Sequence, residues 1–260
     1  MSTDAPTPST GPAPSADDLD SWVGDTAPGP GGRQVFRQHR FRPPPGAADL
    51  IIVRHGESAA QTFETPFPLV DGRSDPPLDP RGEEEARLVA ARLADQDVAA
   101  IYVTPLRRTH ETAAPLAEAL GLTPRVEPDL VEVHLGEWEG AAFRQHTREG
   151  HPLAVRMFTE ERWDVIPGAE PSEAFRARIS AGIGRIAAAH PDERVVVVTH
   201  GGVIGAILSL ATGARPFAFV GGANASINHL VVLGDRWIVR RFNDTGHLGT
   251  DLDRPPEPLT

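Results

Sequence analysis

Apolar residues in this chain gather in short runs, and the stretches between the runs have helical spacing. The runs LIIV (50–53) and VVVVT (195–199) are continuous rather than alternating, so each predicts a strand that is buried on both faces. The pattern predicts further strands over three segments, 98–103, 226–233 and 236–242. These strands are the expected central sheet of the protein.

Helices are predicted between the strands. Asp79 and Pro80 supply an N-cap and a first helical residue, and apolar residues then recur at helical spacing up to Leu93. Further segments are assigned as helix over about 105–120, 172–190 and 201–211, and as irregular or helical cover over 141–165. The fold class is therefore α/β, a three-layer α/β/α sandwich with a mostly parallel central sheet. Ligands of such folds bind at the carboxyl ends of the strands.

The domain organisation follows from the same pattern. Residues 1–47 are rich in Pro, Gly, Ser and Ala and offer little apolar surface to bury, so we expect a disordered N-terminal tail and linker. Residues 48–246 are expected to form one domain. Residues 247–260 are again rich in Pro and are expected to form a loose C-terminal tail.

Composition excludes several kinds of chemistry. All 25 basic residues are Arg and the chain has no Cys, so it lacks Schiff-base lysines, thiolate nucleophiles and disulfides. The formal charge of −11 argues against binding of nucleic acid, which requires many cations on one face. No stretch approaches 18 apolar residues, and the N-terminus lacks the pattern of a secretory signal. We expect no membrane span and a cytoplasmic location.

The candidate chemistry lies at two strand ends. His55 directly follows the first apolar run and His200 directly follows the run 195–199, and a Gly comes after each. A single His at the end of a buried strand is more often structural than functional. Two His in the same context favour a shared role, because both emerge at the carboxyl edge of the predicted sheet.

Phosphoryl transfer fits this pair of histidines. The reaction needs a nucleophile in line with phosphorus and fixed positive donors around the equatorial oxygens. His55 can be the nucleophile, and the planar fork of Arg54 suits phosphate oxygens. Gly56 is expected to let the backbone approach the ligand closely. His200 can donate to another oxygen, and Gly201 opens a helix whose N-terminal amides favour an anion.

Five motifs in order along the chain resemble the histidine phosphatase (phosphoglycerate mutase-like) superfamily. RHGES carries the RHG signature, and TPLRRTHETA is similar to the segment with the second phosphate-binding Arg. LVEVHLGEWEG is similar to the segment with the proton-donating Glu, and VVTHGGVI to the segment with the second catalytic His. The remaining similarity is in DGRSDPPLDPRGEEEA.

This resemblance implies a phosphoglycerate mutase-like fold and a set of residue roles. His55 is the nucleophile, Glu132 exchanges protons with the substrate, and His200 is the second catalytic His. Arg54, Arg108, His200 and Gly201 bind phosphate, and Ser58 and Gln61 contact the substrate. Neither a metal nor another cofactor is implied. The expected partner is a small-molecule phosphomonoester, and the candidate assembly is a homodimer.

Two of these positions have close competitors in the sequence. The motif alignment selects Arg108 rather than its neighbour Arg107. It also selects Glu132 from a segment that holds Glu137 and Glu139 as well. In each case the rejected residues are expected to be solvated or structural.

The chain departs from the family pattern near the first motif. Gln61 stands where the family often has Asn, and an extra stretch with two Phe and two Pro occupies residues 62–72. This insertion either favours substrates with an apolar part or is a simple surface loop.

A phosphatase is favoured over a mutase. PGAEPSEAFRAR (167–178) resembles the phosphatase branch, and a single Arg162 stands where the mutases carry paired Arg. We therefore predict a metal-independent phosphomonoester hydrolase that forms a phosphohistidine on His55. The alternatives are phosphoglycerate mutase-type phosphoryl transfer and a non-catalytic module that only recognises phosphate.

Overall fold

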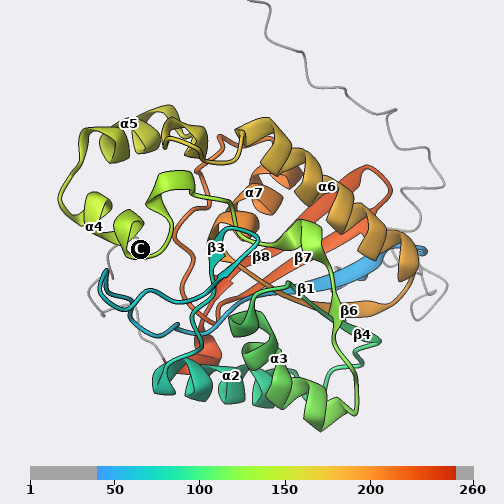
Figure 1. Ribbon diagram of the computed structural model, residues 1–260. Coiled ribbons are helices and arrows are strands. Elements are labelled where there is room, and N and C mark those ends of the chain that lie inside the picture. Colours follow the sequence, from blue (N-terminus) through green and yellow to red (C-terminus); the bar gives the residue numbers. More distant parts are fainter. Residues whose placement is uncertain (1–39, 250–260) are drawn as a thin grey trace, which may run out of the picture. The chain divides into compact units, whose positions relative to one another are not determined.

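Six strands form the central sheet of the computed structural model, which describes residues 40–249 (Figure 1). The predicted N-terminal tail, up to residue 39, and residues 250–260 lie outside the described residues. The strand order is β5-β4-β6-β1-β7-β8. The strands are β1 (Ala48–Arg54), β4 (Ala100–Val103), β5 (Arg125–Val126), β6 (Arg194–Thr199), β7 (Ile227–Leu233) and β8 (Arg236–Asp244). The sequence pattern predicted all of them except the two-residue edge strand β5.

The sheet is parallel from β5 to β1 and antiparallel from β1 to β8. The two most apolar strands, β1 and β6, are neighbours, and their last residues Arg54 and Thr199 are in register. The amide of His55 donates to the carbonyl of Thr199 at 2.9 Å. The register therefore brings His55 and His200 to the same edge of the sheet, as the strand-end argument predicted.

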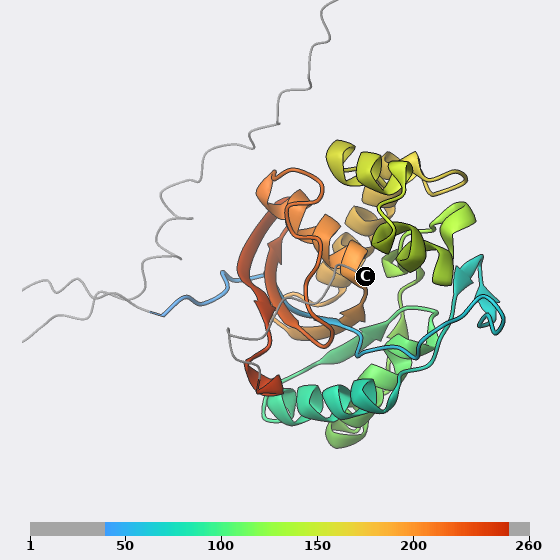
Figure 2. The same ribbon diagram turned by 90° about the vertical axis from the view of Figure 1, so that its left-hand side faces the viewer.

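Helices cover both faces of the sheet, which confirms the three-layer α/β/α sandwich (Figures 1 and 2). Side chains of β1 alternate between two cores: Ile51 and Val53 pack in one cluster, and Leu50 and Ile52 pack in the other. The first cluster includes residues of α2 (Pro80–Leu93) and α3 (Arg107–Leu120), and the second includes residues of α6 (Ser172–Ala189) and α7 (Gly201–Thr212). The helix predicted from Asp79 and Pro80 is present, and the Asp79 side chain accepts from the Gly82 amide at 2.8 Å.

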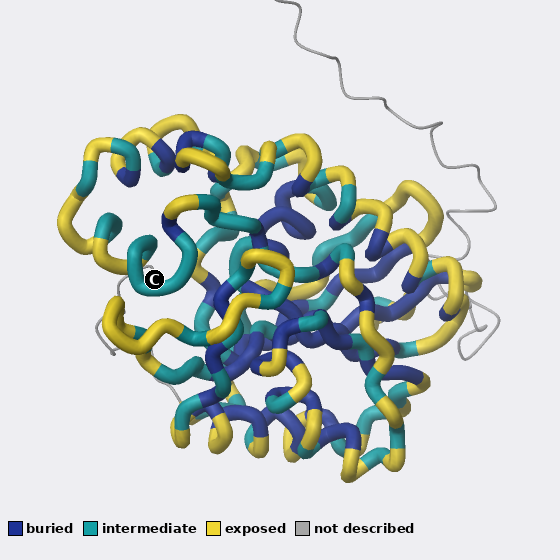
Figure 3. Tube along the Cα trace, viewed as in Figure 1, coloured by how far each residue is buried: buried dark blue, intermediate teal, exposed yellow. Residues whose placement is uncertain are grey.

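The segment between β5 and α6 folds as separate short helices beside the main layers (Figure 1). It contains α4 (Ala141–Arg148) and α5 (Pro152–Glu160), followed by the 3-10 turn η3 (Trp163–Val165). Figure 3 shows the contrast with the sheet, because α4 and α5 are mostly exposed or intermediate while the strands are mostly buried. No residue of α4 is buried, whereas α5 buries Ala154 and Met157. The expectation of helical cover over 141–165 agrees with this segment.

A small hairpin, which the sequence pattern did not predict, leads into α2. It pairs β2 (Leu69–Val70) with β3 (Arg73–Ser74), so the inserted stretch 62–72 ends inside it. Its turn residues, Asp71 and Gly72, have φ values of 47° and 76°, the left-handed conformation of a tight hairpin turn. At the other end of the described range, residues 246–248 form a short 3-10 helix, and Leu248 packs against the α2–α3 core. Between residues 40 and 249, no helix has the length and apolar character needed to cross a membrane.

Candidate active site

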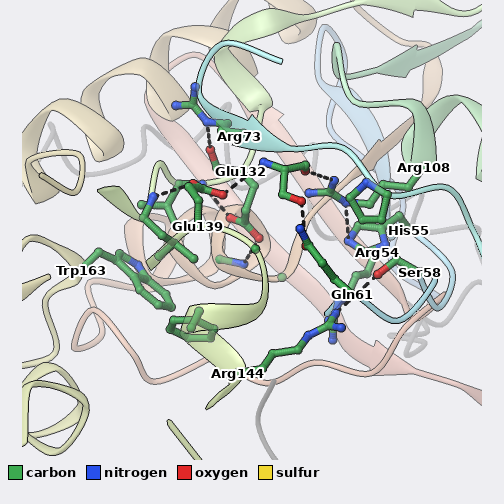
Figure 4. Close-up of a pocket in the computed structure, with 18 of the residues that line it drawn as sticks. Arg54, His55, Ser58, Gln61, Arg73, Arg108, Glu132, Glu139, Arg144 and Trp163 are labelled. Atoms are coloured by element: carbon green, nitrogen blue, oxygen red, sulfur yellow. Dashed lines mark hydrogen bonds between the residues drawn. The ribbon is translucent and has the colours of Figure 1, made fainter. Parts of the chain in front are cut away.

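A cavity of about 190 Å³ opens where β1 and β6 end, and the residues singled out in the sequence gather around it (Figure 4). Those that line it are Arg54, His55, Ser58, Gln61, Arg108, Glu132 and Gly201. His200 is fully buried next to the cavity, and its ring centroid lies 5.2 Å from that of His55. The fold therefore brings all the predicted site residues to one place, although they are spread over about 150 positions of the sequence.

His55 is held with one ring nitrogen turned toward positive donors. Its Nδ1 lies 2.7 Å from the carbonyl oxygen of Gly56, and because a carbonyl only accepts, Nδ1 must carry the hydrogen. The unprotonated Nε2 accepts a hydrogen bond from Nε of Arg108 at 3.2 Å. Burial holds the pKa of His55 well below its ordinary value, and the charges of Arg108 and Arg54 lower it further. His55 is therefore a neutral imidazole with a lone pair on Nε2.

Arg108 and Arg107 point to different surroundings, although they are adjacent at the start of α3. Arg108 is buried, and its NH1 donates to the carbonyl of Ser74 at 3.0 Å. Burial lowers the pKa of Arg108 to about 10, so the guanidinium stays charged near neutral pH. Arg107 is exposed and pairs with Glu111 at 2.8 Å. Arg108 is thus the residue of the two that faces His55, as the motif alignment predicted.

His200 caps α7 and has one ring nitrogen with a partner and one without. Its Nε2 lies 2.9 Å from Oγ1 of Thr104, which follows β4. Its Nδ1 is buried and has no hydrogen-bond partner among residues 40–249. Burial, reinforced by the charge of Arg108, holds the pKa of His200 well below its ordinary value. When Thr104 donates its hydroxyl hydrogen to Nε2, Nδ1 carries a hydrogen that can be donated to a ligand.

Gly56 lies at a tight contact between two parts of the chain. A Cβ on Gly56 would lie 2.6 Å from the carbonyl oxygen of Gly82, and one on Gly82 would lie 2.0 Å from the carbonyl oxygen of Glu57. The two glycines therefore let the turn after β1 press against the first turn of α2. This packing is one reason for a glycine at position 56, and the close approach of its backbone to a ligand stays a prediction.

Glu132 faces the cavity from the loop after the 3-10 turn η1 (Pro128–Leu130). Its Oε1 accepts from the amide of Val133 at 2.9 Å, and its Oε2 accepts from the amide of Gly202 at 3.1 Å. A Cβ on Gly202 would lie 2.6 Å from Oε1, so a glycine is needed for this approach. One amide at the start of α7, that of Gly202, thus holds the carboxylate of Glu132, while Gly201 lines the cavity and its binding of phosphate stays a prediction.

The two competitors of Glu132 have other surroundings or other hydrogen-bond partners. Glu137 is exposed. Glu139 also lines the cavity, but its Oε1 accepts from the amide of Leu135 at 2.8 Å and its Oε2 from the amide of Ser74 at 3.2 Å. Glu139 therefore ties β3 to the loop that carries Glu132. Within residues 40–249, no three His, Asp or Glu side chains are grouped so as to hold a metal ion.

Comparison with known proteins agrees with this geometry. The sequence model of the histidine phosphatase superfamily (branch 1) matches residues 50–245. This chain belongs to the histidine phosphatase superfamily. It is 35% identical over 208 residues to phosphoglycerate mutase-like protein 4 of Arabidopsis thaliana, which covers 77% of this chain and 87% of the relative. It is 31% identical over 206 residues to a metal-independent phosphoserine phosphatase of the same plant, covering 78% and 84% of the two chains.

A solved structure gives the same assignment. The mycobacterial glucosyl-3-phosphoglycerate phosphatase has 29% sequence identity and a TM-score of 0.62, and the match covers 76% of this chain and 100% of that one. The family assignment and the phosphoglycerate mutase-like fold, both expected from the five motifs, are therefore confirmed.

Two arginines that the motifs did not identify hold the loop of Glu132 in this histidine phosphatase. Arg178 on α6 donates to the carbonyl oxygens of Asp129 and Val131, each at 2.7 Å, and to that of Glu132 at 3.1 Å. Arg73 on β3 donates from Nε to the same Glu132 carbonyl at 2.6 Å. The carboxylate of Glu170 pairs with Arg178 at 2.6 Å and keeps the guanidinium in place. The segment 167–178 was singled out only as a sign of the phosphatase branch, and its Arg was not connected to Glu132.

The residues expected on the substrate side differ in whether they line the cavity. Ser58 and Gln61 line the cavity, and Oε1 of Gln61 accepts from Oγ of Ser74 at 2.9 Å. None of residues 62–72 lines the cavity, and Phe63 is 60% exposed. The inserted stretch therefore supplies no apolar contact to the site. The apolar lining comes instead from Phe143, Phe158 and Trp163, on α4, α5 and η3.

Proposed function

We propose that this chain hydrolyses phosphomonoesters through a phosphohistidine on His55, without a metal. The observation that carries the proposal is the state of the His55 ring: Nδ1 is fixed by Gly56, and the lone pair of Nε2 lies 3.2 Å from a buried guanidinium. A neutral imidazole in this position is a nucleophile beside fixed positive charge, which is what attack on a phosphate dianion requires.

In the first step, Nε2 of His55 attacks phosphorus and the bond to the leaving oxygen breaks. Protonated Glu132 gives its hydrogen to that oxygen, so the leaving group departs as an alcohol. Arg54 and Arg108 neutralise charge on the equatorial oxygens, and Nδ1 of His200 donates to one of them. The absence of a partner for this Nδ1 among the described residues supports that role.

In the second step, water attacks phosphorus in line with the N–P bond. Glu132, now a carboxylate, takes a proton from the water, and the N–P bond breaks to release inorganic phosphate. His55 returns to its neutral form and Glu132 to its protonated form, so the cycle is complete. The backbone amides of Val133 and Gly202 hold the Glu132 carboxylate between the steps.

A mutase differs from a phosphatase in having a hydroxyl of a bound phosphorylated acid, rather than water, accept the phosphoryl group. Arg162, which stands where mutases carry paired Arg, is exposed, pairs with Asp164 at 2.8 Å and does not line the cavity. This position therefore gives no support to a second phosphate site, and hydrolysis is the better proposal.

Trapping of the phosphoenzyme tests the proposal. The full chain is mixed with a ³²P-labelled phosphomonoester in the presence of EDTA and quenched in alkali, which preserves phosphohistidine. We expect label on His55 in the wild-type protein and none in His55→Asn, whose rate of phosphate release falls to background. His110→Asn, an exposed His on α3, is the matched control and keeps the wild-type rate. Phosphate release by His55→Asn at the wild-type rate contradicts the proposal. Label on His55 with little phosphate release favours the mutase alternative, and neither label nor phosphate release favours the non-catalytic module.

A further inference from the structure

The cavity is larger than the phosphoryl group alone requires. Its volume is about 190 Å³, whereas a cavity that holds a single water molecule needs only about 10–15 Å³ on the same scale. The phosphoryl group occupies only the end beside His55, Arg54 and Arg108. The remaining space lies against the segment that contains α4, α5 and η3, and it receives whatever carries the phosphate.

Four Arg side chains line the cavity, and three of them either flank the nucleophile or donate to backbone carbonyl groups. Arg54 and Arg108 flank the nucleophile, and Arg54 also donates to the carbonyl of Gly222. Arg73 donates to the carbonyl oxygens of Glu132 at 2.6 Å and Asp71 at 3.2 Å. These groups are therefore committed to the phosphoryl end or to the protein backbone.

Arg144 is the fourth, and it neither flanks the nucleophile nor donates to a backbone carbonyl among residues 40–249. It lies on α4, is exposed, and extends toward Ser58 and Gln61 (Figure 4). Among residues 40–249 it pairs with no carboxylate, and its one hydrogen bond is a long contact of 3.5 Å from NH2 to Oγ of Ser58. It still lies close enough to His55 to contribute to the lowered pKa of that ring. A guanidinium that lines the cavity and pairs with no carboxylate of residues 40–249 favours a second anionic group on the substrate, in addition to the phosphate.

Aromatic rings line the same end of the cavity. Phe143 is next to Arg144 on α4, and its ring centroid lies 6.1 Å from that of Trp163. Phe158 on α5 completes this wall. A polar leaving group the size of a few hydroxylated carbons would leave these rings without an apolar partner, whereas a ring or a branched hydrocarbon would cover them.

We propose that the substrate is the phosphomonoester of an alcohol that carries both a carboxylate and an apolar body of about the size of one ring. Arg144 pairs with the carboxylate, and Phe143, Phe158 and Trp163 contact the apolar body. This inference rests on the proposed function, because it assigns the leaving-group side of the same site.

A set of four substrates separates the two features. Ethyl phosphate has neither feature, carboxymethyl phosphate (2-phosphoglycolate) has only the carboxylate, benzyl phosphate has only the ring, and carboxybenzyl phosphates have both. All are esters of primary alcohols, so the chemistry at phosphorus is similar. We expect kcat/KM of the wild-type chain to be about tenfold higher for the best carboxybenzyl isomer than for benzyl phosphate, and lowest for ethyl phosphate.

Variants assign the effects to residues. In Arg144→Met the preference for carboxybenzyl over benzyl phosphate is expected to fall about tenfold, whereas Arg148→Met, an exposed Arg on the same helix outside the cavity, keeps the preference. In Phe158→Ala the preference for benzyl over ethyl phosphate falls, whereas Val155→Ala, at a 57% exposed position of α5, keeps it. Comparison of substrates on each variant cancels any loss common to all of them.

The outcomes distinguish this inference from the proposed function. If the wild-type chain releases phosphate from all four esters without preference, or if Arg144→Met slows benzyl and carboxybenzyl phosphate equally, the inference is wrong and the hydrolysis remains. If no ester is hydrolysed, the proposed function fails, and calorimetric binding of the matching carboxybenzyl- and benzylphosphonates makes the same comparison without turnover. The wild-type comparison needs no variant, so it decides even where a variant does not fold.

Discussion

The two ends of the cavity differ in how deeply their side chains are buried and how firmly hydrogen bonds hold them. At the phosphoryl end, His55 and His200 are buried at strand ends and kept neutral by burial. Carbonyl and hydroxyl groups at 2.7 and 2.9 Å fix one nitrogen of each ring. At the leaving-group end, the lining belongs to short helices on the surface, and α4 buries none of its residues. Arg144, the charged group at that end, is exposed.

This difference indicates that the phosphoryl end carries out the reaction and the leaving-group end selects the substrate. The phosphoryl end depends on the register of β1 and β6, so a change there disturbs the core of the protein. Positions on α4 can change with little effect on the sheet, because α4 buries none of its residues. The α5 helix reaches the core only through Ala154 and Met157, and its exposed positions are equally free to vary. A common reaction with variable substrates is the expected result of such a division. The predictions that follow test whether the two halves are as separate as the structure indicates.

The largest effect is expected from the arginine that touches the nucleophile. Arg108→Met removes a buried donor beside Nε2 of His55, and loss of one such donor costs about a hundredfold to a thousandfold in kcat. Arg107→Met, at the exposed neighbouring position paired with Glu111, is expected to stay within about threefold of wild type. Steady-state kinetics on benzyl phosphate measure both. Equal losses in the two variants contradict the assignment of Arg108 to the phosphoryl end.

The next effect concerns the clamp on Glu132. Arg178→Met removes the guanidinium that donates to the carbonyl oxygens of Asp129, Val131 and Glu132 and pairs with Glu170. Arg73 still donates to the Glu132 carbonyl, so the loop of Glu132 is held less firmly. We expect kcat to fall about tenfold to a hundredfold with a smaller change in KM, because Glu132 acts in the proton transfers. Arg178→Lys, which keeps the charge but not the planar fork, regains part of the loss.

The control for this variant is Arg176→Met, two positions earlier on α6, which makes none of these contacts and keeps the wild-type kcat. Thermal unfolding is measured in parallel, since loss of Arg178 also destabilises the fold. A variant that loses stability but retains kcat contradicts the positioning role and leaves Arg178 as a purely structural residue.

The sequence predicted the residues at strand ends, but not the residues whose roles depend on contacts between distant segments. The histidine pair was predictable because two continuous apolar runs end in the same His-Gly pattern, and parallel strands place their carboxyl ends together. Arg178 and the aromatic wall were not, because their roles depend on the approach of segments that are distant along the chain. Gly56 was noticed, but its requirement comes from Gly82, which only the packing of α2 reveals.

A moderate effect on stability is expected from the buried histidines. Both have a folded-state pKa well below the ordinary value of 6.5, so below pH 6.5 the unfolded chain binds protons that the folded chain does not. Their contribution to stability is therefore complete above about pH 6.5 and is lost as the pH falls. Between pH 7 and pH 5 the unfolded chain binds these protons and the folded chain does not, so the free energy of unfolding falls over this range.

Denaturant unfolding at several pH values measures this loss of stability. The wild-type chain is expected to lose more free energy of unfolding between pH 7 and pH 5 than His55→Asn does. His110→Asn, at an exposed site, is expected to follow the wild-type curve. If His55→Asn loses as much stability as the wild type over this range, His55 is not kept neutral by burial and the phosphoryl end is more open to water than the structure indicates.

The smallest effect is expected from the inserted stretch 62–72, whose two Phe suggested a role in substrate choice. Phe63 is 60% exposed and no residue of this stretch lines the cavity, so Phe63→Ser should leave kcat/KM within about twofold of wild type on each of the four esters. Its free energy of unfolding should change by less than about 0.5 kcal/mol. Phe158→Ala is the contrasting variant, because that ring lines the cavity. A loss of preference for benzyl phosphate in Phe63→Ser as large as in Phe158→Ala would move substrate choice from α4 and α5 to the loop.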